Sequence, residues 1–174
     1  MGAKGIMKFR QNKSKVIAEQ MFIHQNKTFA QQYFKKGVWG TDLTGGTSAS
    51  SSSTDFVSFD NDNSSPIKFI GDCITEIKRT TGRKPNKLGL GQRVFDALIN
   101  HPDVMNRVIY GGNTASPAMV TTKSLAAILG VDEVVVFDAI WNSANLGEEE
   151  NTGFICDENA MLLAYATSTP MIDE

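Results

Sequence analysis

The chain has 174 residues and a mass of 19.0 kDa, the size of one ordinary domain or of one domain with a short arm. Hydrophobic residues make up 41% of the chain and charged residues 21%, a balance that is typical of soluble globular proteins and excludes collagen-like or wholly disordered chains. The formal net charge of -2 excludes a polycation that coats nucleic acid in bulk.

The charges are unevenly distributed along the chain. Residues 1–40 contain eight Lys or Arg and one Glu, whereas residues 130–174 contain ten Asp or Glu and no Lys or Arg. Three interpretations remain open. Either the opposite charges lie on solvated faces and are separated by chance, or they pair within one chain, or they attract copies of the chain head to tail. Complementary charge steers association more than it fixes affinity, so the pattern alone does not choose between them.

The thiols and the hydrophobic runs indicate where the protein is made. Cys73 and Cys156 are far apart and have no Cys or His at metal-ligand spacing, so we expect buried thiols in a reducing compartment, with one disulfide as the alternative. Charged residues interrupt residues 5–10, which excludes a signal peptide there. Aliphatic runs such as residues 134–137 are far shorter than the roughly 20 residues of a membrane span. We therefore expect an intracellular, soluble protein.

The first predicted element is one long helix over residues 13–36, where no Pro or Gly intervenes and apolar residues recur near a 3.6-residue period. Gly37, which follows Lys35 and Lys36, predicts the end of this helix. Because polar residues dominate it, the helix is expected to lie along the edge of a body. Residues 44–55 are rich in Gly and Ser and predict a linker or an exposed loop.

A second helix has clearer boundaries. It follows a candidate short strand over residues 56–59. Ser64 and Ser65 precede Pro66 in the pattern of an N-cap with Pro at the first helical position, and Gly82 predicts the end. We expect Cys73 in the core rather than as a reactive thiol. The apolar positions of one face are Ile67, Ile70, Cys73 or Ile74, and Ile77.

Short helices and strands alternate in the rest of the chain. The predicted strands cover residues 87–90, 134–137, 154–156 and 161–165, and residues 142–153 are an acidic loop. The predicted helices cover residues 92–99 and 102–110, with another that Thr121 or Thr122 caps and Gly130 ends. Too few strands are separated by full crossovers for a doubly wound sheet, so the predicted class is α+β, or a mixed α/β layer.

Motifs for known chemistry are incomplete. Gly89 and Gly91 stand where a dinucleotide fingerprint begins, but the third position is Val94. Of the two histidines, His24 is expected to be solvated in the long helix, and His101 to cap and turn the chain between two helices. We expect no catalytic, cofactor-binding or metal-binding residues, no cofactor and no enzymatic activity.

Two weaker chemical interpretations concern charged residues. Glu148, Glu149 and Glu150 could hold a divalent cation, but consecutive carboxylates point in different directions, which favours a solvated loop. An acid-base pair of His101 with Asp103, in a small hydrolase or transferase, is the weakest interpretation that stays open.

The order of several short motifs is more specific than any one of them. The runs Thr-Gly-Arg-Lys-Pro-Asn-Lys-Leu at residues 81–88, Asn-His-Pro-Asp-Val at 100–104 and Leu-Ala-Ala-Ile-Leu-Gly-Val at 125–131 follow the helix that Ser-Pro opens. Over residues 64–140, about half of the chain, this order and spacing resembles the major capsid proteins of tailed bacteriophages. The resemblance implies their Johnson fold, shared with herpesvirus capsids, in which a long spine helix accompanies an axial domain with a central sheet flanked by helices.

The resemblance also implies a division of the chain. It assigns residues 1–43 to an N-terminal segment with the spine-type helix of the peripheral domain, 44–59 to a linker with a short strand, and 60–166 to the axial-type domain. Residues 167–174 are then a truncated C-terminal tail. Family members carry an arm and an extended hairpin before the spine helix, and strands that return after the axial domain, so a truncated form is expected here. Gly89 departs from the strand preference for β-branched residues.

The implied function is that of a structural head protein of a tailed phage or prophage, made in the bacterial cytoplasm and located in the virion. It self-assembles into capsomer rings and an icosahedral shell that encloses DNA. The implied partners are copies of itself, other head or scaffolding proteins and packaged DNA through non-specific contacts, with no membrane and no small-molecule substrate. Residues 111–120 and 142–152 are candidate ring contacts. The alternative is a small nucleic-acid-binding module that uses the basic segment 4–15.

Overall fold

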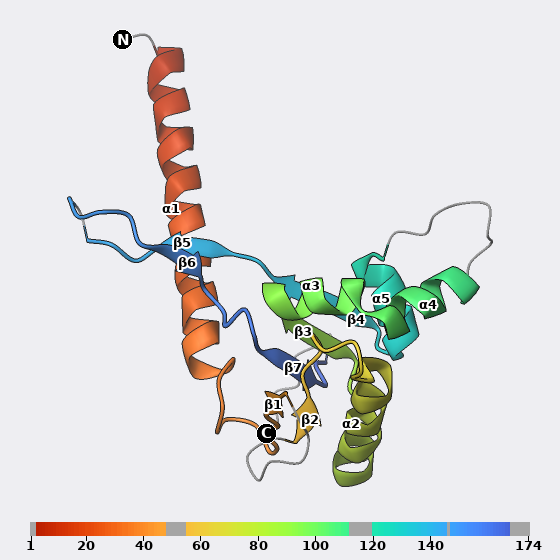
Figure 1. The fold of residues 1–174 in the computed structure, drawn as a ribbon. Helices are drawn as coiled ribbons and strands as arrows, with labels where there is room; N and C mark the ends of the chain where they lie inside the picture. Colours follow the sequence, from red (N-terminus) through yellow and green to blue (C-terminus); the bar gives the residue numbers. More distant parts are fainter. Residues whose placement is uncertain (1–2, 48–54, 112–119, 146, 168–174) are drawn as a thin grey trace. The chain divides into compact units, whose positions relative to one another are not determined.

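The computed structural model describes residues 3–47, 55–111, 120–145 and 147–167. Within these ranges the chain forms five helices and seven short strands, mixed along the sequence (Figure 1). The predicted α+β class is therefore confirmed. The described residues group into two compact units: one comprises residues 1–40 with 139–157, and the other residues 41–138 with 158–174. Residues 139–157 thus pack with the N-terminal helix, whereas the sequence places them in a continuous 60–166 domain.

The first unit is built on α1, Ala3–Gln32. The helix begins ten residues before the predicted start at residue 13, because the polar segment before it contains no Pro and its Gly5 does not interrupt the helix. It ends before the predicted Lys36: the N–H groups of Tyr33 and Phe34 both bond to the carbonyl of Phe29, at 2.8 and 3.2 Å, and Phe34 turns inward and is buried. The long helix is confirmed with shifted ends.

The same unit contains a hairpin of β5, Ile140–Asn142, and β6, Thr152–Phe154, paired antiparallel. The sequence predicts an acidic loop from residue 142 and a strand over 154–156, so the strand prediction is displaced by two residues. The side chain of Asn142 fixes the turn, since its Oδ1 accepts hydrogen bonds from the backbone N–H groups of Ala144 and Asn151, both at 3.0 Å. In Figure 1 the hairpin lies across α1.

The second unit has a mixed sheet of three strands at its centre. Its strands are β3, Lys87–Gly91, β4, Glu133–Phe137, and β7, Met161–Ala164, in the order β4-β3-β7. The central strand β3 runs parallel to β4 and antiparallel to β7. Leu88 and Leu90 on β3 are completely buried, as expected for a strand with neighbours on both sides.

Packing against a neighbouring strand explains Gly89 in the middle of β3. Gly89 pairs with Val135, and Phe137 lies two residues further along β4 on the same face of the sheet. A Cβ atom on Gly89 would lie 2.5 Å from Cε2 of Phe137, well inside van der Waals contact. The Phe137 ring thus occupies the place of a side chain at position 89, which no β-branched residue could share.

Four helices complete this unit: α2, Pro66–Thr81, α3, Gln92–Asn100, α4, Pro102–Gly111, and α5, Thr122–Leu129. Helix α3 packs on β3 and β4, α5 packs on β4, and α2 and α4 both contact α5. The shared core consists of Phe59, Ile67, Ile70, Leu88, Leu90, Leu98, Val104, Leu125, Ala126, Leu129, Val131 and Val134. Helices and sheet together bury one continuous apolar core.

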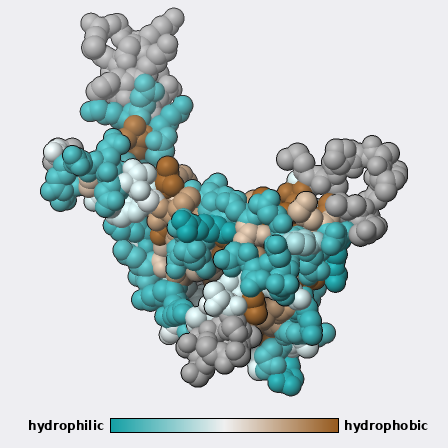
Figure 2. Space-filling view, viewed as in Figure 1, coloured by the Kyte–Doolittle hydropathy of each residue, from teal (hydrophilic) through white to brown (hydrophobic). Residues whose placement is uncertain are grey.

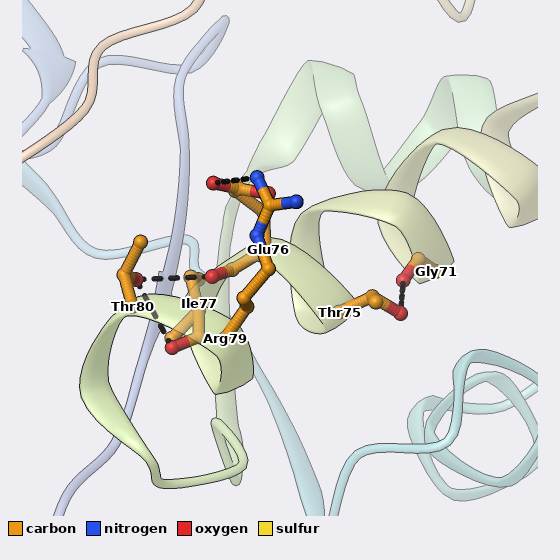
Figure 3. A network of polar contacts seen from close by, with 6 residues as sticks. All are labelled: Gly71, Thr75, Glu76, Ile77, Arg79 and Thr80. Atoms are coloured by element: carbon orange, nitrogen blue, oxygen red, sulfur yellow. Dashed lines mark hydrogen bonds and ion pairs between the residues drawn. The ribbon is translucent and has the colours of Figure 1, made fainter.

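Helix α2 has the predicted ends. Pro66 is the first helical residue, and Gly82 ends the helix in the left-handed conformation at φ 70°, where its N–H bonds to the carbonyl of Lys78. Ser65 occupies the N-cap position without a side-chain capping bond. Figure 3 shows the polar side of the helix, where Thr75 and Thr80 donate to carbonyls one turn earlier and Arg79 binds the Glu76 carboxylate at 2.7 Å.

The N-cap residue of helix α5 is Thr121. The side chain of Thr121 accepts a hydrogen bond from the N–H of Ser124 at 3.2 Å, and the Ser124 hydroxyl oxygen accepts one from the N–H of Thr121 at 2.8 Å. This reciprocal pair is a capping box. Gly130 ends the helix at φ 73°, as predicted.

The Gly- and Ser-rich segment is anchored at both ends. Strand β1, Gly45–Gly46, pairs in parallel with β2, Phe56–Val57. The N–H of Thr44 donates to the Asp55 carboxylate at 2.7 Å, and the N–H of Asp55 donates to the carbonyl of Thr44 at 2.8 Å. The sequence predicts a linker or an exposed loop over 44–55; the structure adds a short paired strand near its start, and residues 48–54 lie outside the described part of the chain.

Candidate functional site

His101 is the most buried ionisable side chain of the described residues, with 2% of its surface exposed. It lies between α3 and α4. Its Nδ1 accepts a hydrogen bond from the N–H of Asp103 at 3.1 Å, and its backbone carbonyl accepts from Val104 and Met105 at 3.1 and 3.0 Å. These bonds satisfy N–H groups that the first turn of α4 would otherwise leave unpaired. The prediction that His101 caps a helix junction is confirmed.

The other ring nitrogen of His101 holds a distant loop. Nε2 lies 3.0 Å from the Ser64 hydroxyl and 3.2 Å from the Asn61 carbonyl. Since Nδ1 accepts from a backbone N–H, the proton of the neutral ring is on Nε2 and points at these two oxygens. The ring therefore joins the loop before α2 to the junction of α3 and α4.

The pair Ser64 and His101 resembles a nucleophile and its base in distance only. A base that activates a serine needs an unprotonated nitrogen toward the hydroxyl, whereas here that nitrogen carries the proton. The third group is also different, because Asp103 contacts the ring through its backbone N–H. Ser64 is buried as well. The contacts of Ser64 and His101 thus hold the loop before α2 at the junction of α3 and α4, and we call these two residues the structural node.

The remaining residues with predicted chemistry lie apart from this node. His24 is exposed on α1, as expected. Glu148, Glu149 and Glu150 are exposed in the loop between β5 and β6, also as expected. In the described ranges, no group of three or more His, Cys, Asp or Glu side chains is arranged to hold a metal ion.

Both cysteines are free thiols in this structure. Cys73 is half-buried on α2, and Cys156 is buried. Burial raises the pKa of the Cys73 thiol, and the nearby Asp72 carboxylate raises it further. Burial also raises the pKa of Cys156. Both sites therefore hold the neutral thiol, which is the less reactive form.

The first unit carries the largest exposed apolar side chains. On α1, Ile17, Met21 and Phe22 are 61%, 67% and 65% exposed. Figure 2 shows apolar groups that interrupt the hydrophilic surface over the part of α1 that is not grey. The sequence predicts a helix along the edge of a body and does not say which of these residues stay exposed. Apolar positions on α1 are spread around its circumference, so periodicity alone does not identify the covered side.

The covered side of α1 faces the hairpin. The ammonium group of Lys27 lies 3.8 Å from the centre of the Trp141 ring, a cation–π contact between α1 and β5. Side chains alternate across a strand, so the neighbours of Trp141 point to the other face of the hairpin. Ile140 on that face is 58% exposed, and Phe154, which pairs with it across the hairpin, is 37% exposed.

Some predicted contact regions fall outside what the structure describes. Of the candidate ring contact 111–120, residues 112–119 are not described. The candidate contact 142–152 comprises the ends of the hairpin strands and their loop, apart from residue 146. The basic segment 4–15 lies within α1.

Among the described residues, no helix is long and apolar enough to cross a membrane.

The chain is similar in structure to a known protein, whereas comparisons of sequence found no match. No protein-family model and no curated protein matches the chain. Among solved structures, the chain is similar to a phage-related protein from Bordetella bronchiseptica, with a TM-score of 0.67 and 20% sequence identity. The match covers 92% of this chain and 47% of that protein, so this chain spans about half the length of its structural neighbour. The two proteins share a fold.

Proposed function

We propose that this chain is a structural subunit of the head of a tailed phage or prophage. In this role it associates with copies of itself into capsomer rings and a shell around DNA, and it is located in the virion. The observation that carries the proposal is the shared fold with a phage-related protein over 92% of this chain. The ordered motifs between residues 64 and 140, which resemble those of major capsid proteins, support the same role.

The proposal includes a correspondence of parts with the Johnson fold. Helix α1 takes the place of the spine helix, and the unit around the sheet β4-β3-β7 takes the place of the axial domain. The expected partners are copies of the chain, other head or scaffolding proteins, and DNA through non-specific contacts. This role requires no catalytic group, cofactor or small-molecule substrate, and the polar roles of His101 described above agree with that.

Exposed apolar residues on α1 and on the hairpin agree with self-association. Met21 is 67% exposed, and moving such an apolar side chain out of water against a partner is favourable in free energy. Isolated apolar residues are common on protein surfaces, but adjacent ones mark interaction sites more often.

The test is the association state of the purified chain. We expect sedimentation velocity and light scattering to show species larger than a monomer as the protein concentration rises, and negative-stain electron microscopy to show rings or shells. Complexes that depend on charge weaken as salt rises. A chain that remains monomeric at high concentration and low salt would contradict the proposal.

A second candidate function is binding to nucleic acid through the basic segment 4–15. Its support is the structure of α1, since this one helix carries six Lys or Arg and one Glu. Phosphate contacts release counterions, so the affinity for DNA should fall steeply with salt. Fluorescence anisotropy with labelled DNA tests this function: deletion of residues 1–15 should remove binding, and equal binding of both forms would exclude it.

A further inference from the structure

The turn after α2 carries the densest group of basic residues in the chain. Residues 78–87 contain five Lys or Arg and no Asp or Glu, whereas any ten consecutive residues of α1 contain at most four Lys or Arg. The C-terminus of a helix attracts cations, which accounts for Lys78 and Arg79 but not for the three that follow Gly82. Positive charge at this density indicates an anion-binding surface.

Carboxylates neutralise two of the five cations. Arg79 binds Glu76 at 2.7 Å on the exposed side of α2 (Figure 3), and Lys87 pairs with Glu133 of the neighbouring strand β4. The other three side chains are exposed and form no ion pair with a residue that the structure describes. These three cations, which keep their charge at the surface, are Lys78, Arg83 and Lys84.

An aromatic ring holds Arg83 without cancelling its charge. The Cζ atom of the Arg83 guanidinium lies 5.2 Å from the centre of the Tyr165 ring, directly after β7. A cation–π contact restrains the guanidinium and leaves its N–H groups for acceptors. Because two parallel N–H groups of a guanidinium match the oxygens of a phosphate, Arg83 is suited to bind one.

Hydrogen bonds to the backbone fix the shape of the turn. The Thr81 hydroxyl oxygen accepts the N–H of Arg83 at 3.2 Å. The side chain of Asn86 donates to the carbonyl of Ala166 and accepts the N–H of the same residue, both at 2.8 Å, which fastens the turn to the segment that carries Tyr165. The turn is therefore formed before a partner binds, and little conformational entropy is lost on binding.

The composition of this surface favours a phosphate polyanion over a second protein. Protein interfaces bury an apolar core that is poor in charge. Of the large apolar side chains that are exposed in the described ranges, Tyr165 alone lies in this turn or beside it. Interfaces with nucleic acid are polar and positively charged. The five basic residues also outnumber the adjacent acidic ones, which are Glu76, Asp132 and Glu133.

We propose that Lys78, Arg83 and Lys84 form a site for the phosphate backbone of DNA, and we call these residues with Tyr165 the basic patch. The proposal rests on the head-protein function for the identity of the polyanion, since a shell subunit meets packaged DNA. It assigns the DNA contact to the sheet-containing unit, whereas the second candidate function assigns it to α1. Tyr165 is a positioning residue that acts through Arg83.

Removal of charge from the basic patch tests the site. The variant Arg83→Gln with Lys84→Gln removes two of its cations. The matched control, Arg107→Gln with Lys123→Gln, removes one Arg and one Lys that are exposed on α4 and α5 of the same unit. Since all four side chains are exposed, the fold should persist, and circular dichroism checks this. Fluorescence anisotropy with a short labelled DNA duplex measures the affinity of the full chain over a series of salt concentrations.

We expect the patch variant to bind the duplex about tenfold more weakly than the wild type at low salt. Each phosphate contact contributes about -0.9 to the slope of log affinity against log salt, so this slope should become shallower by about 2. The control should keep the affinity and the slope of the wild type. A wild type that binds no duplex at low salt, a patch variant that binds like the wild type, or an equal loss in the control overturns the proposal.

The ring of Tyr165 gives a second measurement. Tyr165→Leu releases Arg83 and should weaken binding about two- to fivefold, whereas Tyr165→Phe keeps the ring face and should bind like the wild type. In the background Arg83→Gln, the change Tyr165→Leu should have no effect, because no guanidinium remains to be positioned. An equal loss from Tyr165→Leu in both backgrounds would overturn the positioning role.

The outcomes separate the site from the head-protein function. Sedimentation velocity should show that the patch variant associates like the wild type. If the patch variant loses association and keeps DNA binding, the patch contacts an acidic surface of a second copy and the proposal is wrong. If deletion of residues 1–15 removes DNA binding and the patch variant retains it, the second candidate function holds and the proposal is wrong. If the wild type binds DNA through the patch but stays monomeric, the head-protein function fails and the site stands.

Discussion

Substitution of Gly89 by Ala tests how the centre of the sheet is packed. The added methyl group would lie 2.5 Å from Cε2 and 2.9 Å from Cζ of Phe137. Carbon atoms in good contact are roughly 3.5 Å apart, so the ring has to move by about 1 Å. Gly89 is buried and lies on the central strand, where neighbours on both sides restrict such movement.

Two effects of opposite sign determine the change in the free energy of unfolding. Overpacking of a core costs about 1–3 kcal/mol. Replacing Gly by Ala lowers the entropy of the unfolded chain and stabilises the fold by about 0.4–1 kcal/mol. The steric effect is larger, so Gly89→Ala should destabilise the protein by about 1–2 kcal/mol, or about 2–8 °C in Tm for a domain of this size.

Urea denaturation in a double-mutant cycle measures this effect. In the background Phe137→Leu, the smaller side chain leaves room for the methyl group, and Gly89→Ala should become neutral or stabilising. The coupling between the two positions is then about 1–3 kcal/mol. An equal cost of Gly89→Ala in both backgrounds, or a Gly89→Ala variant as stable as the wild type, would refute the role assigned to Phe137.

Three further predictions use the same unfolding assay. His101→Ala removes the hydrogen bonds of the ring to Asp103, Ser64 and Asn61 and leaves the buried Ser64 hydroxyl without this partner. It should cost about 2–3 kcal/mol, and a loss below about 0.5 kcal/mol would contradict the structural node. Thr121→Ala removes the capping box and should cost about 1 kcal/mol, whereas Lys123→Ala on the exposed side of α5 should change stability little. Because burial raises the pKa of Cys73 and Cys156, the folded state keeps the thiol protons at a pH at which the unfolded chain loses them. The contribution of the thiols to the free energy of unfolding is therefore complete below the ordinary thiol pKa and is lost as pH rises past it. A Cys73→Ser, Cys156→Ser variant should lack this alkaline loss, and identical pH profiles would exclude it.

Local signals in the sequence predicted the helices with clear ends. For α2, Pro66 and Gly82 are sufficient, because each acts on the backbone at its own position. For α5, Thr121 and Gly130 act in the same way. The role of His101 was also predictable, since an Asn-His-Pro run between two predicted helices indicates a turn and a helix cap.

Features that depend on distant residues were not predictable. The unusual Gly89 is explained only by Phe137, which lies 48 positions later on a neighbouring strand. The pairing of β1 with β2 joins residues across the Ser-rich segment, and no local pattern of two glycines indicates a parallel bridge. The grouping of the hairpin with α1 depends on Trp141 and Lys27, which are even further apart in the chain.

The same limit applies to the exposed apolar residues of α1. Periodicity identified the apolar residues of α1 but not which of them remain exposed, because that depends on where the hairpin crosses the helix. Charge polarity along the chain was visible in the sequence, whereas the opposition of helix and hairpin within one unit was not.

The reciprocal bonds between Thr44 and Asp55 have a practical consequence for engineering. They fix both ends of the intervening stretch, beside the paired strands β1 and β2. Lengthening a closed loop costs only about 0.6 kcal/mol for each doubling of its length. An insertion between Gly46 and Asp55 would thus leave these two hydrogen bonds and the pairing of β1 with β2 in place.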